Sequence, residues 1–296
     1  MNIQFLFILI MLLHFEANAQ NNHNFKTHYQ IFGSGKPILI INGGPGMNSN
    51  GFKEMANKIA DLGYQTIIFD QRGTGNSKLN KLNTQTISMD LMVEDMEALR
   101  KQLKIKKWTI LGHSFGGLLA CHYFSKYSKN IDKLIFSSSA GVNMNFTTYI
   151  NDRVKKNLTQ MQRDSLAFYE SKMQEGDTTF TTIKKRAGYL ANAYSYNKEY
   201  TKNIANRLLE LNFTVNNLVF QDLIKIKYNY TNQFIKKSTP VLIIQGLNDV
   251  ISPETAKEIH QSFGNSTIYL LENCGHYGWL DKPTEYFDNI SQFLKK

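Results

Sequence analysis

The feature that most constrains the fold of this chain is a series of short, continuous apolar runs, each bounded by turn residues. Such runs are typical of strands that are buried on both faces of a parallel sheet. Apolar residues recur at helical spacing in residues 52–62 and 87–103, between successive runs. We therefore predict an α/β fold with a mostly parallel, doubly wound sheet. The clearest runs lie at residues 38–41, 66–69, 108–111, 134–136 and 241–244.

A long interruption divides this pattern in the middle of the chain. Between residues 142 and 237 the only regular patterns are amphipathic helical stretches, and the strand pattern resumes at Pro240. We expect a helical cap domain at 142–237, inserted between two parts of one α/β core at 20–141 and 238–296. The expected helical stretches are 149–173, 183–194, 202–211 and 217–228.

The first residues have the pattern of an export signal. An apolar run at residues 5–13 is too short to span a bilayer, and Ala17 and Ala19 follow it at the spacing that signal peptidase accepts. This pattern predicts a signal peptide at 1–19 and a secreted or periplasmic protein with no stable membrane insertion after cleavage. Because neither Lys nor Arg precedes the apolar run, an uncleaved anchor is the alternative.

Charge and cysteine content restrict the class of protein further. The formal net charge is +10, but the lysines and arginines are spread along the chain without a dense cluster that also holds aromatic residues. This distribution argues against nucleic acid as a partner and favours a solvated basic surface. The two cysteines, Cys121 and Cys274, are too few for a disulfide-stapled scaffold, and we expect both to be buried thiols.

A candidate nucleophile lies in the sequence LGHSFGG at residues 111–117. It contains the pattern G-x-S-x-G, in which the glycines let the backbone turn sharply and expose a serine hydroxyl. The segment follows the predicted strand at 108–111 and precedes a helical run at 118–124, so Ser114 is expected at the carboxyl end of a strand, where α/β proteins carry their chemistry. A serine nucleophile requires a histidine base and an acid elsewhere in the chain.

The candidate base and acid are chosen by their order in the sequence, because the serine motif is expected to be followed first by an acidic residue and then by a histidine. Asp249 follows the strand run at 241–244, and His276 lies in the loop after a last strand at 268–271. We predict that His276 is the general base and that Asp249 orients it. Helix capping or a loop role is the alternative for Asp249, and a structural loop role is the alternative for His276. His113, next to the nucleophile, is expected to shape the turn.

An oxyanion hole is expected next to Ser114. A negative charge develops on the substrate oxygen when a serine attacks a carbonyl carbon, so backbone N–H groups must be held close to it. The N–H of Phe115 is one expected donor, and the second is expected from the glycine-rich loop after the first inner strand, at Gly44, with Gly43 as the alternative. A plain turn is the other interpretation of this loop. The chemistry calls for neither a metal nor an organic cofactor.

Three segments of the chain form a specific combination of motifs. They are NGGPG at residues 42–46, DQRGTGNS at 70–77 and GHSFGG at 112–117. Together they resemble the proline iminopeptidase group of serine peptidases, which has the α/β-hydrolase fold, and the likeness to that fold extends over nearly all of residues 25–295. The resemblance implies that the helical insertion caps the active site, that acidic cap residues hold the substrate's N-terminal ammonium, and that a small pocket takes the proline ring.

Some positions depart from the family's pattern or stay open. The family's glycine-rich loop usually begins with His, where this chain has Asn42, and its turn commonly has Trp, where this chain has Phe115. Both changes can reshape the floor of the pocket. Asp70 and Arg72, at the end of the strand run at 66–69, are expected to form a charged pair that braces the turn at Ser114 or the glycine-rich loop, and so to give structural support rather than chemistry. The candidate ammonium-binding acids of the cap are Glu170, Glu175, Glu199 and Glu210, and the sequence does not choose among them.

The sequence therefore predicts a serine hydrolase that works through an acyl-enzyme on a small-molecule or short-peptide substrate. The favoured activity is that of an aminopeptidase that releases N-terminal, proline-type residues from short peptides. An esterase or amidase that acts on small non-peptide acyl compounds is the closest alternative, and it needs no ammonium-binding acid. A non-catalytic ligand-binding protein with the same fold is the alternative of another class. The oligomeric state is left open.

Overall fold

A seven-stranded sheet forms the centre of the protein, with strand order β1-β3-β2-β4-β5-β6-β7. The computed structural model describes residues 25–296, so the predicted signal peptide at 1–19 lies outside the described residues. Neighbouring strands pair in parallel except β1 and β3, which pair antiparallel. The strands are β1 (Tyr29–Phe32), β2 (Lys36–Ile41), β3 (Tyr64–Phe69), β4 (Trp108–His113), β5 (Ile131–Ser137), β6 (Val241–Gly246) and β7 (Ser266–Leu271).

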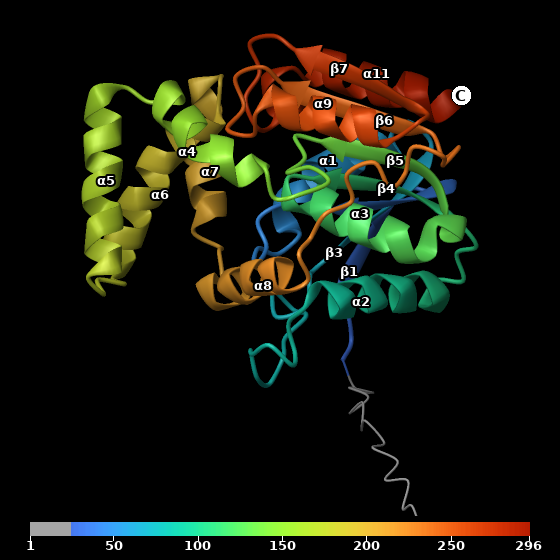
Figure 1. Ribbon diagram of the computed structural model, residues 1–296, viewed down its shortest axis with the longest axis horizontal. Coiled ribbons are helices and arrows are strands. Elements are labelled where there is room, and N and C mark those ends of the chain that lie inside the picture. Colours follow the sequence, from blue (N-terminus) through green and yellow to red (C-terminus); the bar gives the residue numbers. More distant parts are fainter. Residues whose placement is uncertain (1–24) are drawn as a thin grey trace, which may run out of the picture.

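The predicted fold class is confirmed, because helices and strands alternate around this mostly parallel sheet (Figure 1). Each predicted apolar run lies inside a strand, and every residue of β4 and β6 is buried, as expected for central strands of a parallel sheet. The sequence pattern does not predict the antiparallel edge strand β1. Its residues, YQIF, are at most half-buried and form no buried apolar run.

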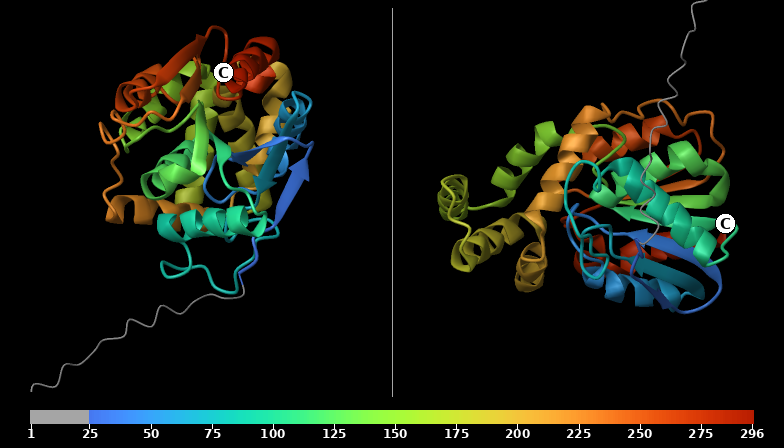
Figure 2. Two further views of the ribbon diagram at one scale, coloured as in Figure 1. Left: turned by 90° about the vertical axis from the view of Figure 1, so that its right-hand side faces the viewer. Right: turned by 90° about the horizontal axis from the view of Figure 1, so that it is seen from below.

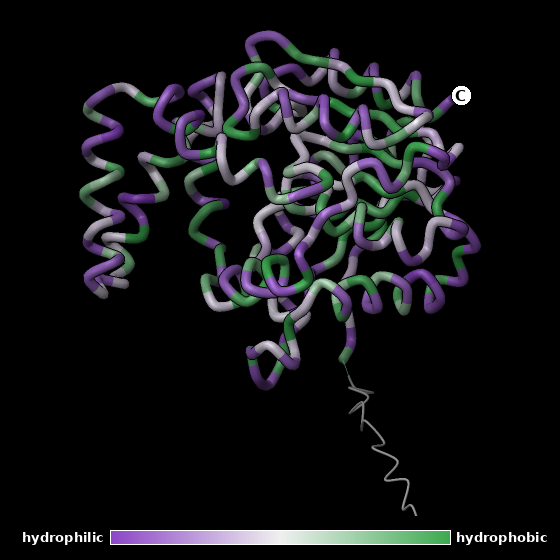
Figure 3. Tube along the Cα trace, in the orientation of Figure 1, coloured by the Kyte–Doolittle hydropathy of each residue, from purple (hydrophilic) through white to green (hydrophobic). Residues whose placement is uncertain are grey.

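Helices cover both faces of the sheet, as two further views show (Figure 2). Apolar side chains of α2, α3 and α9 pack against one face, and those of α1, α10 and α11 pack against the other. Apolar segments concentrate in the sheet between these helical layers (Figure 3). The helices of the core are α1 (Lys53–Ala60), α2 (Met89–Gln102), α3 (Phe115–Tyr127), α9 (Pro253–Ser262), α10 (Gly278–Asp281) and α11 (Pro283–Lys295).

Helices α4 to α8, which we call the cap helices, lie between β5 and β6 in the chain and within the range 142–237. Figure 1 shows α5 and α6 extending away from the sheet, whereas α8 packs beside α2, where Asp222 accepts a hydrogen bond from Met89 N at 2.8 Å. In the part of the chain that the structure describes, no helix has the length and apolar character needed to cross a membrane. The cap helices are α4 (Phe146–Asn157), α5 (Gln160–Gln174), α6 (Phe180–Tyr194), α7 (Thr201–Leu208) and α8 (Phe213–Lys225), and short 3₁₀ helices lie at Asn50–Phe52, Ser128–Asn130 and Lys198–Tyr200.

The predicted helical stretch at 149–173 is in fact parts of two helices, α4 and α5. The chain leaves helical geometry at Leu158, whose ψ is 147°. Thr159 then starts α5 with a capping box, in which Thr159 Oγ1 accepts from Gln162 N at 3.3 Å and Gln162 Oε1 accepts from Thr159 N at 2.9 Å. Apolar periodicity continues across the break, which is why the pattern alone joins the two helices.

Both cysteines are buried free thiols, as predicted. Burial raises the pKa of the Cys121 thiol to about 12, and it also raises the pKa of the Cys274 thiol. Both thiols therefore stay protonated at neutral pH, and a protonated thiol is a poor nucleophile.

The packing of β5 predicts a large loss of stability when one of its core side chains is shortened. Ile135 is 1% exposed and packs in the layer that includes α1 and α11. We expect Ile135→Ala to lower the free energy of unfolding by about 2–5 kcal/mol, because it removes buried apolar surface and leaves a cavity. Chemical denaturation followed by circular dichroism measures this. The control is Ile224→Ala on α8, where the side chain is 69% exposed, and an equal loss from both variants would contradict the assigned core.

Candidate active site

Ser114 lies on a tight turn between β4 and α3, as the motif predicts. β4 ends at His113, α3 begins at Phe115, and Ser114 between them has a φ of 54° and a ψ of −121°. A positive φ is strained for a residue other than glycine and persists only where surrounding contacts enforce it. The Ser114 N–H donates to Ser137 O at 3.0 Å, and the Ser114 carbonyl accepts from Ala140 N at 3.0 Å. These bonds to the segment at the end of β5 hold the turn.

The glycines around Ser114 are required because the backbones of β2, β4 and α3 approach one another closely. A Cβ atom on Gly116 would lie 2.2 Å from Ile41 O, and one on Gly112 would lie 2.5 Å from Gly116 O. No side chain fits at such distances from a backbone oxygen. The pattern G-x-S-x-G is thus a packing requirement that presses the Ser114 turn against the end of β2.

His276 and Asp249 are in direct contact. His276 Nδ1 lies 2.8 Å from Asp249 Oδ1, and the two side chains are 4% and 0% exposed. Since a carboxylate only accepts hydrogen bonds, Nδ1 carries the proton of this bond and Nε2 is left to accept another proton. Asp249 also accepts hydrogen bonds from Gln245 Nε2 at 2.7 Å and from Ile251 N at 2.9 Å. These contacts hold the carboxylate, and through it the imidazole, in one orientation.

Ser114 and His276 line the same small cavity, which has a volume of about 70 Å³. Within residues 25–296 the Ser114 hydroxyl makes no hydrogen bond, and the hydrogen bond between a nucleophile and its base is often long or poorly aligned before a substrate binds. The cavity lies where the sheet edge meets the cap helices. Its cap residues are Tyr194, Arg207 and Leu208.

Backbone N–H groups next to Ser114 are available to bind an oxyanion. Phe115 is the first residue of α3, where N–H groups have no partner within the helix. Among the described residues, no acceptor takes a hydrogen bond from the N–H of Phe115, Gly43 or Gly44. A Cβ atom on Gly43 would lie 2.7 Å from Ser114 Cβ, so only glycine lets the loop come this close. Both Gly43 and Gly44 line the cavity, and both stay candidates for the second donor.

His113 is buried beside His276 and is neutral at pH 7. It is 1% exposed, and its ring centroid lies 4.6 Å from that of His276 and 4.8 Å from that of Trp279. Burial, followed by the charges of His276 and Arg207, lowers the pKa of His113 well below its usual value. A neutral, packed imidazole fits the predicted role of His113 in shaping the turn.

Asp70 and Arg72 make structural contacts, but they do not pair with each other. Asp70 accepts hydrogen bonds from Ser49 N and Ser49 Oγ, both at 2.8 Å, which fixes the chain just after the glycine-rich loop. Arg72 forms a bidentate ion pair with Asp95 of α2, with both N···O distances at 2.6 Å. The two residues therefore brace different parts of the core.

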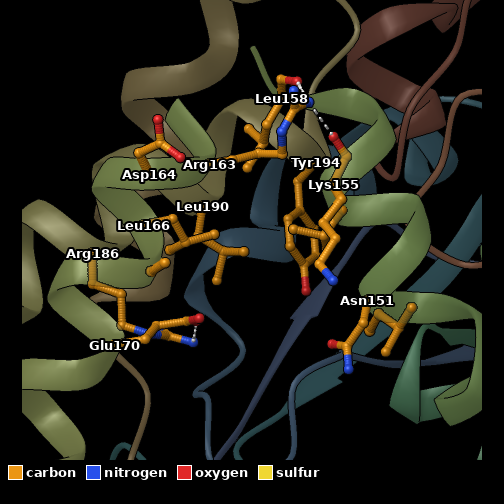
Figure 4. Close-up of a pocket in the computed structure, with 13 residues that line it drawn as sticks. Asn151, Lys155, Leu158, Arg163, Asp164, Leu166, Glu170, Arg186, Leu190 and Tyr194 are labelled. Carbon is orange, nitrogen blue, oxygen red and sulfur yellow. Dashed lines mark hydrogen bonds and ion pairs between the residues drawn. The ribbon is translucent and has the colours of Figure 1, made fainter. Parts of the chain in front are cut away.

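A second and larger cavity, of about 510 Å³, lies among α4, α5 and α6 (Figure 4). Tyr194 lines both cavities, and Figure 4 shows its hydroxyl pointing into the larger one. Tyr194 also meets His276, because its carbonyl accepts from His276 N at 2.8 Å and the two rings are in edge contact. The end of α6 therefore separates the two cavities.

The structure narrows the choice among the cap glutamates. Glu170 lines the larger cavity and pairs with Arg186 at 3.1 Å. Glu210 lines neither cavity itself, but it pairs with Arg207, which lines the smaller one. Glu175 and Glu199 also line neither cavity, and their hydrogen-bond partners, Ser171 and Asn197, line neither as well.

No sequence pattern marks Tyr194, Arg207 and Tyr277 as residues of the site. The first two reach the cavity because α6 and α7 fold over the sheet edge, which local periodicity does not encode. Tyr277 has a usable signal, since it directly follows His276 in the sequence.

Curated proteins that resemble this chain include proline iminopeptidases. The proline iminopeptidase of Lactobacillus acidophilus is 27% identical over 282 residues, which cover 91% of this chain and 94% of that protein. The proline iminopeptidase of Lacticaseibacillus rhamnosus is 27% identical over 294 residues, which cover 92% of this chain and 95% of that protein.

Solved structures with a similar fold include two esterases. The esterase from Exiguobacterium antarcticum has a TM-score of 0.70 and 20% identity, over 91% of this chain and 96% of that one. A thermophilic esterase from Thermogutta terrifontis has a TM-score of 0.69 and 19% identity, over 91% and 93%. At these identities the likeness shows the shared fold alone. The family described as "alpha/beta hydrolase fold" matches residues 36–283, and because this match spans most of the sequence, the chain belongs to the alpha/beta hydrolase fold family.

Proposed function

We propose that this chain is a serine hydrolase that releases N-terminal, proline-type residues from short peptides. The observation that carries the proposal is the 2.8 Å contact between His276 Nδ1 and Asp249 Oδ1 beside the cavity that holds Ser114. An imidazole oriented by a buried acid, next to a serine on a strained turn, is the arrangement that acyl transfer requires. The similarity to proteins named proline iminopeptidase supports the peptide specificity.

In the proposed reaction Ser114 Oγ attacks the carbonyl carbon of the substrate's first residue, and His276 Nε2 takes the hydroxyl proton. The N–H group of Phe115 and that of Gly44, or of Gly43 as the alternative, bind the oxyanion. His276 then gives the proton to the leaving amine, the C–N bond breaks, and the acyl-enzyme remains. Water attacks the ester with the same imidazole as base, which frees the acyl group and restores Ser114. Asp249 stabilises the imidazolium through its hydrogen bond to Nδ1.

The cavity volumes support release of one small residue. The cavity at Ser114 has about 70 Å³, far below the roughly 300–1,000 Å³ of sites that hold a drug-sized ligand. It therefore suits a short acyl group. The larger cavity on the other side of Tyr194, with about 510 Å³, offers room for the rest of the peptide.

Glu210 is the cap acid that best suits the substrate's ammonium. Its partner Arg207 lines the cavity at Ser114, so its carboxylate lies near the acyl side of the reaction. Glu170 lies in the larger cavity, on the proposed leaving-group side. The ammonium of the first residue lies close to the scissile bond, so the acid that binds it must also lie close to Ser114, which favours Glu210.

An esterase or amidase remains the second candidate, and Arg207 is the observation that favours it. A buried guanidinium in the wall of the cavity repels a substrate ammonium unless Glu210 offsets its charge. A neutral acyl compound meets no such repulsion. The choice between the two therefore depends on whether a free amine helps or hinders binding.

The first test uses Pro-β-naphthylamide, its N-acetylated form and p-nitrophenyl acetate as substrates. We expect wild type to cleave the free-amine substrate fastest and Ser114→Ala to lower kcat by about 10⁴-fold or more, because the alanine variant has no nucleophile. Steady-state release of the coloured or fluorescent product measures the rates.

Other outcomes of this test separate the alternatives. Turnover of the ester without turnover of the proline amide would establish an esterase and discard the peptidase assignment. If all three substrates were inert with folded wild type, the hydrolase proposal would fail and ligand binding would be the better account.

The buried acid predicts a second outcome. We expect Asp249→Asn to lower kcat by about 10³–10⁴-fold, because an amide that donates to Nδ1 forces the imidazole into the tautomer whose Nε2 already carries a proton. The control is Asp288→Asn, at an exposed position on α11, which should leave kcat unchanged. Equal activity of Asp249→Asn and wild type would exclude Asp249 from the reaction.

The ammonium assignment predicts a substrate-dependent effect. We expect Glu210→Gln to raise KM for Pro-β-naphthylamide by about 10-fold, because it removes the charge that offsets Arg207, and to leave KM for p-nitrophenyl acetate within about 2-fold. Glu175→Gln, which changes an acid away from both cavities, is the matched control. The same rise in KM for both substrates would show that Glu210 does not read the amine.

A further inference from the structure

The loop that carries the proposed oxyanion donors, residues 42–48, is held from two sides. On the core side, Asn42 Nδ2 donates to Gly43 O at 3.1 Å and to Met47 O at 3.0 Å, and Gln71 Nε2 donates to Asn42 O at 3.0 Å. These bonds fix the start of the loop and its internal fold. None of these three hydrogen bonds involves the carbonyl of Pro45, Gly46 or Asn48.

The cap holds the middle of the loop. Asn212 N donates to Gly46 O at 2.9 Å, and Asn216 Nδ2 donates to Pro45 O at 2.9 Å. A Cβ atom on Gly46 would lie 2.5 Å from Asn212 O, so only glycine permits this approach. The start of α8 therefore rests directly on the loop.

Arg207, in the last turn of α7, holds the far end of the loop. Its Nη1 donates to Asn48 Oδ1 at 3.1 Å, and its Nη2 donates to Asn48 O. The guanidinium carbon lies 6.0 Å from the centre of the Phe52 ring, and the Arg207 side chain is only 8% exposed. A Cβ atom on Gly51 would lie 2.8 Å from Arg207 Cδ, so the chain beyond the loop leaves space for this one side chain.

We propose that Arg207 is a positioning residue that sets the oxyanion loop from the cap. The inference rests on the proposed serine mechanism, because the loop position matters only if Gly43 or Gly44 binds the oxyanion. Through Arg207 the placement of α7 fixes Asn48, and through Asn48 it fixes the loop that carries these N–H groups. The cap thereby controls the geometry of the oxyanion hole as well as access to the cavity.

Arginine suits this task because its planar guanidinium carries several donors in a fixed geometry. It contacts the side-chain oxygen and the backbone oxygen of Asn48 together, and Nη1 still reaches Glu210. A lysine ammonium lacks the fork that joins both oxygens. Removing a nearly buried charge from its partners is costly, so the guanidinium of Arg207 stays beside Asn48 and Glu210.

The test measures whether Arg207 acts on the oxyanion. For Arg207→Met we expect kcat to fall by about 10–100-fold with both Pro-β-naphthylamide and p-nitrophenyl acetate, because a displaced donor loses part of the 10²–10³-fold effect of a removed one. KM for the ester should stay within about 3-fold, and KM for the free-amine substrate should not rise, because the variant also removes the charge that repels an ammonium. The inhibition constant of a short alkyl trifluoromethyl ketone should rise by a similar factor, since this compound becomes an oxyanion when Ser114 adds to it. Arg207→Lys should recover only part of the loss.

Two further variants complete the test. Lys202→Met removes the same charge from an exposed position of α7 and should leave kcat and the inhibition constant unchanged. Asn216→Ala removes one hydrogen bond to Pro45 without leaving a buried charge, and it should also lower kcat, by a smaller factor than Arg207→Met. If the melting temperature shows that Arg207→Met does not fold, Asn216→Ala tests the inference in its place.

The outcomes that overturn the inference differ from those that overturn the proposed function. Wild-type kcat and wild-type ketone inhibition in folded Arg207→Met would exclude the positioning role. A rise in KM for the free-amine substrate alone would make Arg207 a substrate contact instead. A fall in kcat with unchanged ketone inhibition would indicate loss of active protein rather than a displaced loop. Failure of the proposed function appears separately, as full activity in Ser114→Ala.

Discussion

Ser114 holds a φ of 54° because the turn between β4 and α3 is clamped between the end of β2 and the segment after β5. Gly116 lies against Ile41 O, and the Ser114 backbone bonds to Ser137 and Ala140. These contacts exist only if β2 and β5 flank β4 in the sheet, which is the observed order. The strain at one residue is therefore sustained by the topology of the whole sheet.

The parallel arrangement also explains how distant residues meet. The loops after β2, β4, β6 and β7 all leave the sheet at the same edge, because these strands point the same way. Asp249 follows β6 and His276 follows β7, so the 2.8 Å contact between them joins neighbouring strand ends. The register of β6 and β7 brings the two residues together, and the hydrogen bonds from Gln245 and Ile251 then orient the Asp249 carboxylate.

Local patterns in the sequence predict those features that depend on neighbouring residues. Apolar runs predict the buried strands, and the glycines around Ser114 predict its turn. The places of Asp249 and His276 after late strand runs predict that both lie at the same edge of the sheet. The contact of Arg207 with Asn48 has no such signal, because the two residues are 159 positions apart and meet only when the cap folds onto the core. The break at Leu158 is missed for a related reason, since apolar periodicity continues across it. The choice between Gly43 and Gly44 depends on distances that no pattern encodes.

The cap helices contribute both lining residues and a charged group to the cavity at Ser114, and the side chain of Arg207 provides both. Arg207 lines the cavity at Ser114 and pairs with Glu210, and its charge adds to the effect of burial in lowering the pKa of His113. The same guanidinium bonds to Asn48 at the end of the oxyanion loop. Under the proposed function, a change in the charge that a substrate amine meets would therefore also alter the forces on the loop proposed to bind the oxyanion. In the proposed reaction both effects pass through Arg207, so substrate preference and turnover would be coupled, and α7 would be the element through which both can be adjusted.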